Sequence, residues 1–151
     1  MVDLQQVKYG LSTPPVAALD NAAAVATVFD WNDHDGANYV EFIAIIGATD
    51  TADTVHRVME SDTKTDATTL GGTPVLVQTI TPHSATDDNN IVAIVGIHRA
   101  GRERYMQLQY TAPDGTITTF YTSLFAVSRR GTDVTSTLAS RGALAVHYVT
   151  G

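Results

Sequence analysis

The chain has 151 residues, with 16 acidic and 9 basic side chains and a formal net charge of −7. This length suits one domain, and the acidity disfavours nucleic acid and anionic membrane surfaces as direct partners. Cysteine is absent, which excludes disulfides and thiolate metal sites. No apolar run approaches the roughly 18–20 residues of a membrane span, and no signal peptide is predicted at the N-terminus.

The N-terminal residues are predicted to form an extended arm. Pro14 and Pro15 fix φ and remove two backbone donors, so regular structure should stop there. The predicted division is therefore an arm at residues 1–20 and a single β-sandwich domain at residues 21–151. Deletion of residues 2–15 is expected to weaken attachment to a partner and to leave the sandwich folded.

The next segment is ambiguous between helix and strand. Residues 16–26 are rich in alanine and could form a helix, but Thr27, Val28 and Phe29 favour a strand from about residue 24. Residues 30–36 follow as a polar turn.

Alternation of apolar and polar residues predicts strands along the rest of the chain. It is clearest at residues 105–110, where Met106, Leu108 and Tyr110 alternate with polar or amphipathic residues. Residues 39–46 are apolar on both faces, which suits an interior strand covered on both sides. Further strands are predicted at residues 54–60, 75–80, 91–98, 116–128 and 143–149, with loops at 47–53, 61–72, 81–90 and 129–142.

About eight short strands with turn signals between them indicate an all-β fold. We predict an antiparallel β-sandwich, jelly-roll-like, with no confident helix and no internal repeat.

The polar turn at residues 30–36 is the best candidate for a metal site, because carboxylate oxygens are ligands for Ca²⁺. The EF-hand spacing fails, however, since Trp31 and Phe42 would occupy its first and last ligand positions. A plain turn with local side-chain to backbone bonds is the favoured interpretation. The histidines, at 34, 56, 83, 98 and 147, show no zinc motif. No metal and no cofactor are predicted.

Catalytic motifs are also missing. The chain has no nucleophile elbow, no Walker loop and no dinucleotide fingerprint. A hydrolase with histidine or paired carboxylates is the least favoured hypothesis, and the protein is predicted not to be an enzyme.

Two groups of side chains suit protein or ligand contacts. Arginines lie around the turn at residues 99–104, where they could meet acidic partner surfaces or simply be solvated. Trp31, Tyr39 and Tyr105 could stack on a sugar ring, although core or interface positions are favoured for them.

Three segments then resemble one known family. Asp35-Gly36-Ala37 leads into an apolar strand, Glu60-Ser61-Asp62-Thr63 follows the next strand, and Asn90-Ile91 opens a strand that leads through a basic turn to Arg104-Tyr105. Over residues 35–111 this order is similar to small tailed-phage head accessory proteins encoded near the major capsid protein. The chain departs from their pattern at Thr63, at Glu103 and in the longer turn at residues 98–100.

The resemblance implies a capsid decoration, or cement, protein that binds the assembled major capsid lattice. It implies a homotrimer on the capsid exterior of the virion, made in the host cytoplasm, with no nucleic acid or membrane partner. The alternative is a glycan-binding β-module of a phage fibre, spike or tail. The predicted partner contacts are Val2, Leu4, Val7, Tyr9, Leu11, Trp31, Arg99 and Arg102.

Overall fold

The structure is a computed structural model, in which the following residues are described: 7–16, 19–20, 22–34, 36–47, 56–80, 90–112, 117–118, 121–128 and 146–149. Nearly all regular structure in them is β-strand, with one short 3-10 turn, η2 (Trp31–Asp33). No helix in this part of the chain is long and apolar enough to cross a membrane.

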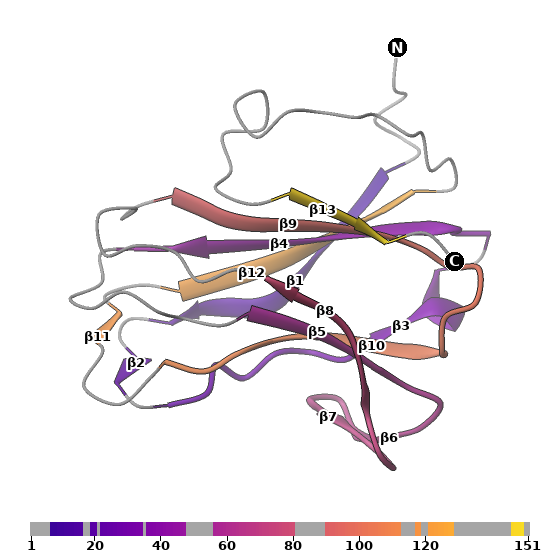
Figure 1. Cartoon of the computed structure of the whole chain (residues 1–151), viewed down its shortest axis with the longest axis horizontal. Coiled ribbons are helices and arrows are strands. Elements are labelled where there is room, and N and C mark those ends of the chain that lie inside the picture. Colours follow the sequence, from indigo (N-terminus) through magenta and orange to yellow (C-terminus); the bar gives the residue numbers. More distant parts are fainter. Residues whose placement is uncertain are drawn as a thin grey trace.

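The strands form two main sheets (Figure 1). One has the order β1-β12-β4-β9-β13 and the other the order β3-β10-β5-β8. Their pairings are antiparallel except that of β13 with β9, which is parallel. The strands of the first sheet are β1 (Val7–Val16), β12 (Tyr121–Ser128), β4 (Tyr39–Ile46), β9 (Asn90–His98) and β13 (Val146–Val149). Those of the second are β3 (Phe29–Asp30), β10 (Tyr105–Tyr110), β5 (His56–Ser61) and β8 (Val75–Ile80).

The strand order is that of a jelly roll. If β13 is set aside and the other eight strands of these sheets are numbered in chain order, the sheets read 1-8-3-6 and 2-7-4-5. Two sheets of four strands connected in this way define the jelly roll. The predicted all-β, antiparallel, jelly-roll-like sandwich is therefore confirmed, and β13 is an addition at one edge.

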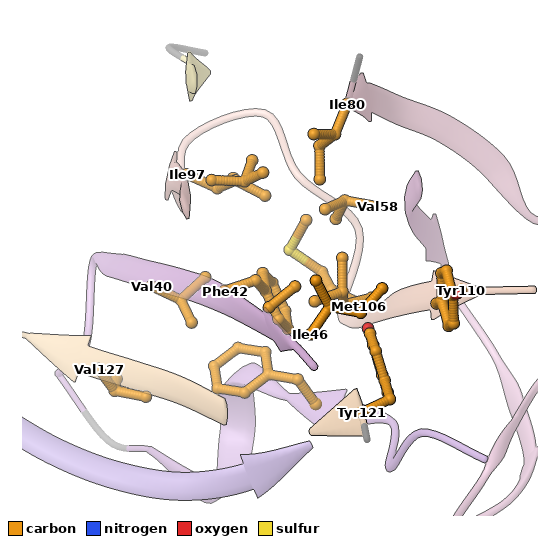
Figure 2. Close-up of a cluster of buried hydrophobic side chains, with 14 of the residues drawn as sticks. Val40, Phe42, Ile46, Val58, Ile80, Ile97, Met106, Tyr110, Tyr121 and Val127 are labelled. Atoms are coloured by element: carbon orange, nitrogen blue, oxygen red, sulfur yellow. The ribbon is translucent and has the colours of Figure 1, made fainter. Parts of the chain in front are cut away.

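The core lies between the two sheets (Figure 2). Phe42, Val95 and Tyr121 from the first sheet pack against Met106 and Leu108 from the second, and all five are at most 1% exposed. Alternation along β10 places its apolar residues inside, as the sequence predicts, because successive side chains of a strand point to opposite faces.

Strand β4 is buried differently on its two faces. The residues that face the core, such as Phe42 and Ala44, are fully buried, whereas Glu41, Ile43 and Ile45 on the outer face are half-buried. The expectation of complete cover on both sides is thus correct only for the inner face.

The N-terminal segment differs from its prediction. Instead of a free arm, Val7–Val16 is strand β1, paired with β12 at the edge of the five-stranded sheet. Pro14 and Pro15 lie within it because an edge strand needs ladder hydrogen bonds on one side only, and the register shifts near them. The expectation that the prolines end regular structure is wrong.

Smaller differences concern three predicted segments. The expected loop at residues 61–72 contains a hairpin of β6 (Lys64–Asp66) and β7 (Thr69–Leu70). The expected strand at residues 116–128 is divided into β11 (Ile117–Thr118), which pairs with β2 (Leu19–Asp20), and β12. Most of the loops predicted at residues 47–53 and 81–90, and the connector predicted at 129–142, lie outside the described residues.

Candidate functional site

Strand β1 is the terminal strand of its sheet, and its second half is closed to a partner. The Ser12 carbonyl accepts a hydrogen bond of 2.6 Å from the backbone N–H of Thr27. Beyond it, Pro14 and Pro15 have no N–H to offer. Both features are ways in which proteins keep sheet edges from pairing with other chains.

The first half of β1 is open. Tyr9 is 67% exposed and Leu11 is 54% exposed, on a strand whose only described pairing is with β12. Lys8, which precedes Tyr9 in β1, is also exposed. An exposed strand edge with apolar side chains favours pairing with another chain.

An apolar strip extends from this edge across the outer face of the sheet. Leu11 lies opposite Leu124 of β12, and Leu124 lies opposite Ile43 of β4. Paired residues point to the same face of a sheet, so these three side chains form one row on the outer face. Leu124 and Ile43, the two members away from the edge, are half-buried. We name these residues, together with Tyr9, the β1 strip: Tyr9, Leu11, Leu124 and Ile43.

The opposite face of β1 is fixed by a close contact. A Cβ built on Gly10 would lie 2.3 Å from Cζ of Phe125, so only glycine allows the strand to lie this close to the ring. Phe125 in turn contacts the Phe29 ring, with 5.2 Å between the ring centroids. Tyr9 and Leu11 of the β1 strip therefore lie on a strand that is packed against the core.

Two carboxylates, from the strands on either side of β10, hold the arginine-rich turn between β9 and β10. Arg104 donates two hydrogen bonds to the Asp30 carboxylate, from Nε at 3.0 Å and from Nη2 at 2.8 Å. Arg102 Nη1 lies 3.4 Å from Glu60 Oε1, and the Glu103 N–H donates to Glu60 Oε2 at 3.1 Å. Arg102 and Arg104 thus have acidic partners within the protein, and Arg102 as a partner contact remains a prediction.

Trp31 is not a surface residue. Its ring is 1% exposed, with the exposed Arg99 guanidinium 5.7 Å from the ring centroid. The prediction of Trp31 as a partner contact is therefore wrong, because Asp30 and η2 turn its ring into the core beside Phe29. Arg99, above it, faces solvent.

The aromatic rings considered for sugar stacking are covered. Trp31, Tyr39 and Tyr105 are each at most 8% exposed. Tyr105 belongs to a small second cluster with Val28 and Leu70, where the β6–β7 hairpin folds over the sheet. These three rings offer no open platform for a sugar ring.

The polar turn at residues 30–36 has a local structural function. One Asp30 carboxylate oxygen accepts from the Asn32 N–H at 2.9 Å and caps η2. The hydrogen bonds from Arg104 are the main reason that the pKa of Asp30 lies below its ordinary value. Asp35 lies outside the described residues, and among the described ones no three His, Asp or Glu side chains gather closely enough for a metal.

The described histidine rings lie against aromatic neighbours. His56 is buried, with its centroid 4.6 Å from the Tyr110 ring, and the Tyr110 and Tyr121 centroids are 4.4 Å apart. His34 stacks on Phe29 at 5.0 Å, and burial lowers the pKa of His34. Burial also raises the pKa of Tyr121. His98 contacts the Tyr39 ring, whereas His83 and the side chain of His147 lie outside the described residues.

The predicted contact residues are therefore only partly brought together. Tyr9 and Leu11 share one exposed face, Arg99 and Arg102 lie on the separate β9–β10 turn, Val2 and Leu4 lie outside the described residues, and of Val7 only the backbone is described. The sequence reasoning missed Leu124 and Ile43 as surface residues. Isoleucines at alternate positions of residues 39–46 were the available signal, because one of the two faces must point away from the core.

Comparisons with known protein families, with curated proteins and with solved structures find nothing that matches this chain. Function must therefore be argued from the site itself.

Proposed function

We propose that this protein is a capsid decoration subunit, a structural protein of the virion that binds the assembled major capsid lattice of a tailed phage. It is non-enzymatic in this proposal, forms a homotrimer and occupies the capsid exterior after synthesis in the host cytoplasm. Binding only the assembled lattice would stabilise that lattice by mass action.

The open half of β1 carries the proposal. A jelly roll alone supports many functions, including viral capsid proteins and lectins, so the fold does not identify one. The β1 strip supplies what a decoration protein needs, namely an exposed apolar edge on a rigid strand. The resemblance of residues 35–111 to phage head accessory proteins supplies the class of partner. The glycan-binding alternative has less support, because Trp31, Tyr39 and Tyr105 are buried and Tyr9 is its single exposed ring among the described residues.

Point substitutions test the proposal better than a truncation. Removing residues 2–15 would take away most of β1 and the buried side chains of Ser12 and Thr13, and so would disturb the sheet itself. Tyr9→Ser with Leu11→Ser instead removes two exposed apolar groups and leaves the pairing with β12 in place.

The measurement is occupancy of the protein on purified capsids that have been stripped of it, read from band intensities after sedimentation. We expect the double variant to lose at least about tenfold in apparent affinity, since each exposed apolar side chain contributes roughly 1 kcal/mol or more at an interface. The matched control is Val75→Ser with Leu76→Ser, two residues of similar exposure on the edge strand β8. Equal occupancy by wild type and the β1 variant, or equal losses in both variants, would contradict the proposal.

A further inference from the structure

Three aromatic rings lie behind the open half of β1, and one of them can be protonated. The His34 ring is stacked on the Phe29 ring, with 5.0 Å between the centroids and 7° between the planes. It also meets the Phe125 ring edge-on, with the centroids 5.6 Å apart. Phe125 and Phe29 are themselves in contact, so the three rings form one group, which we name the His34 cluster.

The His34 cluster supports β1 by two routes. Gly10 of β1 is paired with Phe125 and lies so close to its ring that an added Cβ would be 2.3 Å from Cζ. Lys8 lies on the same face of the strand as Gly10, because side chains two residues apart point the same way. Lys8 is exposed, and its positive charge disfavours a second positive charge on His34. A change at His34 can therefore reach β1 through the Phe125 ring and through Lys8.

The position of one ring nitrogen favours neutral His34. Its Nδ1 is buried and has no hydrogen-bond partner among the described residues. A neutral imidazole can carry its proton on Nε2 and leave only a lone pair at Nδ1, whereas an imidazolium has an N–H at both nitrogens. Protonation thus places a buried donor and a positive charge where no described acceptor receives them, and such burial is costly.

The charged groups that face His34 come from three elements. Among the described residues they are Lys8 of β1, Asp33 of η2 and Asp30 of β3. Strand β12 contributes the uncharged Phe125. Burial has the largest effect and lowers the pKa of His34, Lys8 lowers it further, and the two carboxylates act in the opposite direction. The pKa of His34 lies below its ordinary value of 6.5 as a result.

We propose that His34 is an acid-sensitive switch for β1, whose open half is loosened from the sheet edge when this ring is protonated. The imidazolium repels Lys8 and turns toward solvent, which is near because His34 is only half-buried. Phe125 then loses one of its supports, and Gly10 is packed on Phe125. The switch belongs to the free protein and does not depend on the proposed function.

The direction of the effect follows from proton linkage. A histidine whose pKa is lowered in the packed state binds a proton more readily once it is released from that state. The packed state of β1 is therefore fully stabilised above pH 6.5. It loses stability as the pH falls below 6.5, and the loss is complete below the lowered pKa of His34.

The test is amide hydrogen exchange, followed by nuclear magnetic resonance on the ¹⁵N-labelled full chain from about pH 7.5 to about pH 5, the range in which histidine titrates. The ring titration of His34 is recorded in the same samples, and we expect its pKa below 6.5. We expect the protection factors of the β1 amides that bond to β12 to fall at least about threefold, with a midpoint at that pKa. Protection of the β10 amides should stay constant.

A matched pair of variants assigns the effect to His34. His34→Phe keeps an aromatic ring in the cluster and removes the titration, so the fall in protection should disappear. His98→Phe makes the same change at another half-buried histidine, which contacts Tyr39, and the fall should remain. Lys8→Ala removes the repelling charge and should move the midpoint to higher pH.

Four results would overturn the proposal. They are a pKa of His34 at or above 6.5, the same fall in protection in His34→Phe, its loss in His98→Phe, and a midpoint that Lys8→Ala does not raise.

Discussion

At the scale of single residues, two buried carboxylates determine how the β9–β10 turn is held. Asp30 is 4% exposed and Glu60 is 7% exposed, and each accepts hydrogen bonds from the segment of residues 102–104. A buried carboxylate without such donors would be strongly destabilising. These contacts bring together residues about 40 and 70 positions apart in the chain, which no local pattern could show.

Asp30→Asn tests this arrangement. We expect it to lower the free energy of unfolding by about 1–2 kcal/mol at pH 7 in urea denaturation, a modest figure because the partner side chain is half exposed. The pKa of Asp30 is lowered, so its stabilisation is present above the ordinary value of 3.8 and is lost as the pH falls through the folded-state value. The difference between wild type and variant should therefore be full at pH 7 and shrink below pH 3.8.

The neighbouring exposed residue supplies the control. Asp33→Asn makes the same chemical change one turn away, and it should alter the urea midpoint little at either pH. A wild-type to Asp30→Asn difference that stays constant from pH 7 to pH 3 would show that the Asp30 charge is not responsible.

At the scale of elements, β1 combines a closed half, an open half and a tightly packed inner face. Ser12 and Thr13 in the closed half are fully buried, and the Thr13 carbonyl accepts from Thr122 Oγ1 at 2.8 Å. The open half presents Tyr9 and Leu11. An edge strand that is protected over only part of its length indicates where another chain can be accommodated.

Gly10→Ala tests how tightly β1 is packed. The added methyl group would meet the Phe125 ring at 2.3 Å, and the ring is held by Phe29, so strand or ring must shift. We expect a loss of about 1–3 kcal/mol of unfolding free energy, measured by thermal and urea denaturation. Lys8→Ala, on the same strand but exposed, should change stability by less than about 0.5 kcal/mol. A neutral Gly10→Ala would mean that β1 lies farther from β12 in solution.

At the scale of the whole molecule, one core joins both sheets. The main cluster includes residues from β3, β4, β5, β8, β9, β10 and β12, so neither sheet has a core of its own. A domain with one shared core unfolds cooperatively. The single tryptophan, Trp31, belongs to this cluster and reports on it.

We therefore expect Trp31 fluorescence and far-ultraviolet circular dichroism to give the same unfolding curve. Phe42→Ala, at the centre of the core, should lower the unfolding free energy by about 3–5 kcal/mol, as in other large-to-small core substitutions. Val25→Ala, at a residue that is 65% exposed, should have almost no effect. Two separate transitions in the wild type would show that the sheets unfold independently.

The sequence was sufficient for the parts of this protein that depend on local periodicity. Alternation at residues 105–110 and the apolar run at residues 39–46 predicted strands within a residue or two of β10 and β4. The number and spacing of strands then led to the sandwich. Pro14 and Pro15 were misread because their local preference is the same in an arm and in an edge strand, and only the position of β1 in the sheet distinguishes these cases.

By itself, then, the sequence determined the fold class, since a side-chain period of two requires strands with one buried face wherever they lie. It also predicted Tyr9 and Leu11 as partner contacts; both side chains are exposed, and their contact with a partner stays a prediction. The tertiary structure alone decided which faces remain open, because exposure depends on neighbours far away in the chain. It buried Trp31 under Arg99, paired Asp30 with Arg104, and placed Leu124 and Ile43 in one row with Leu11.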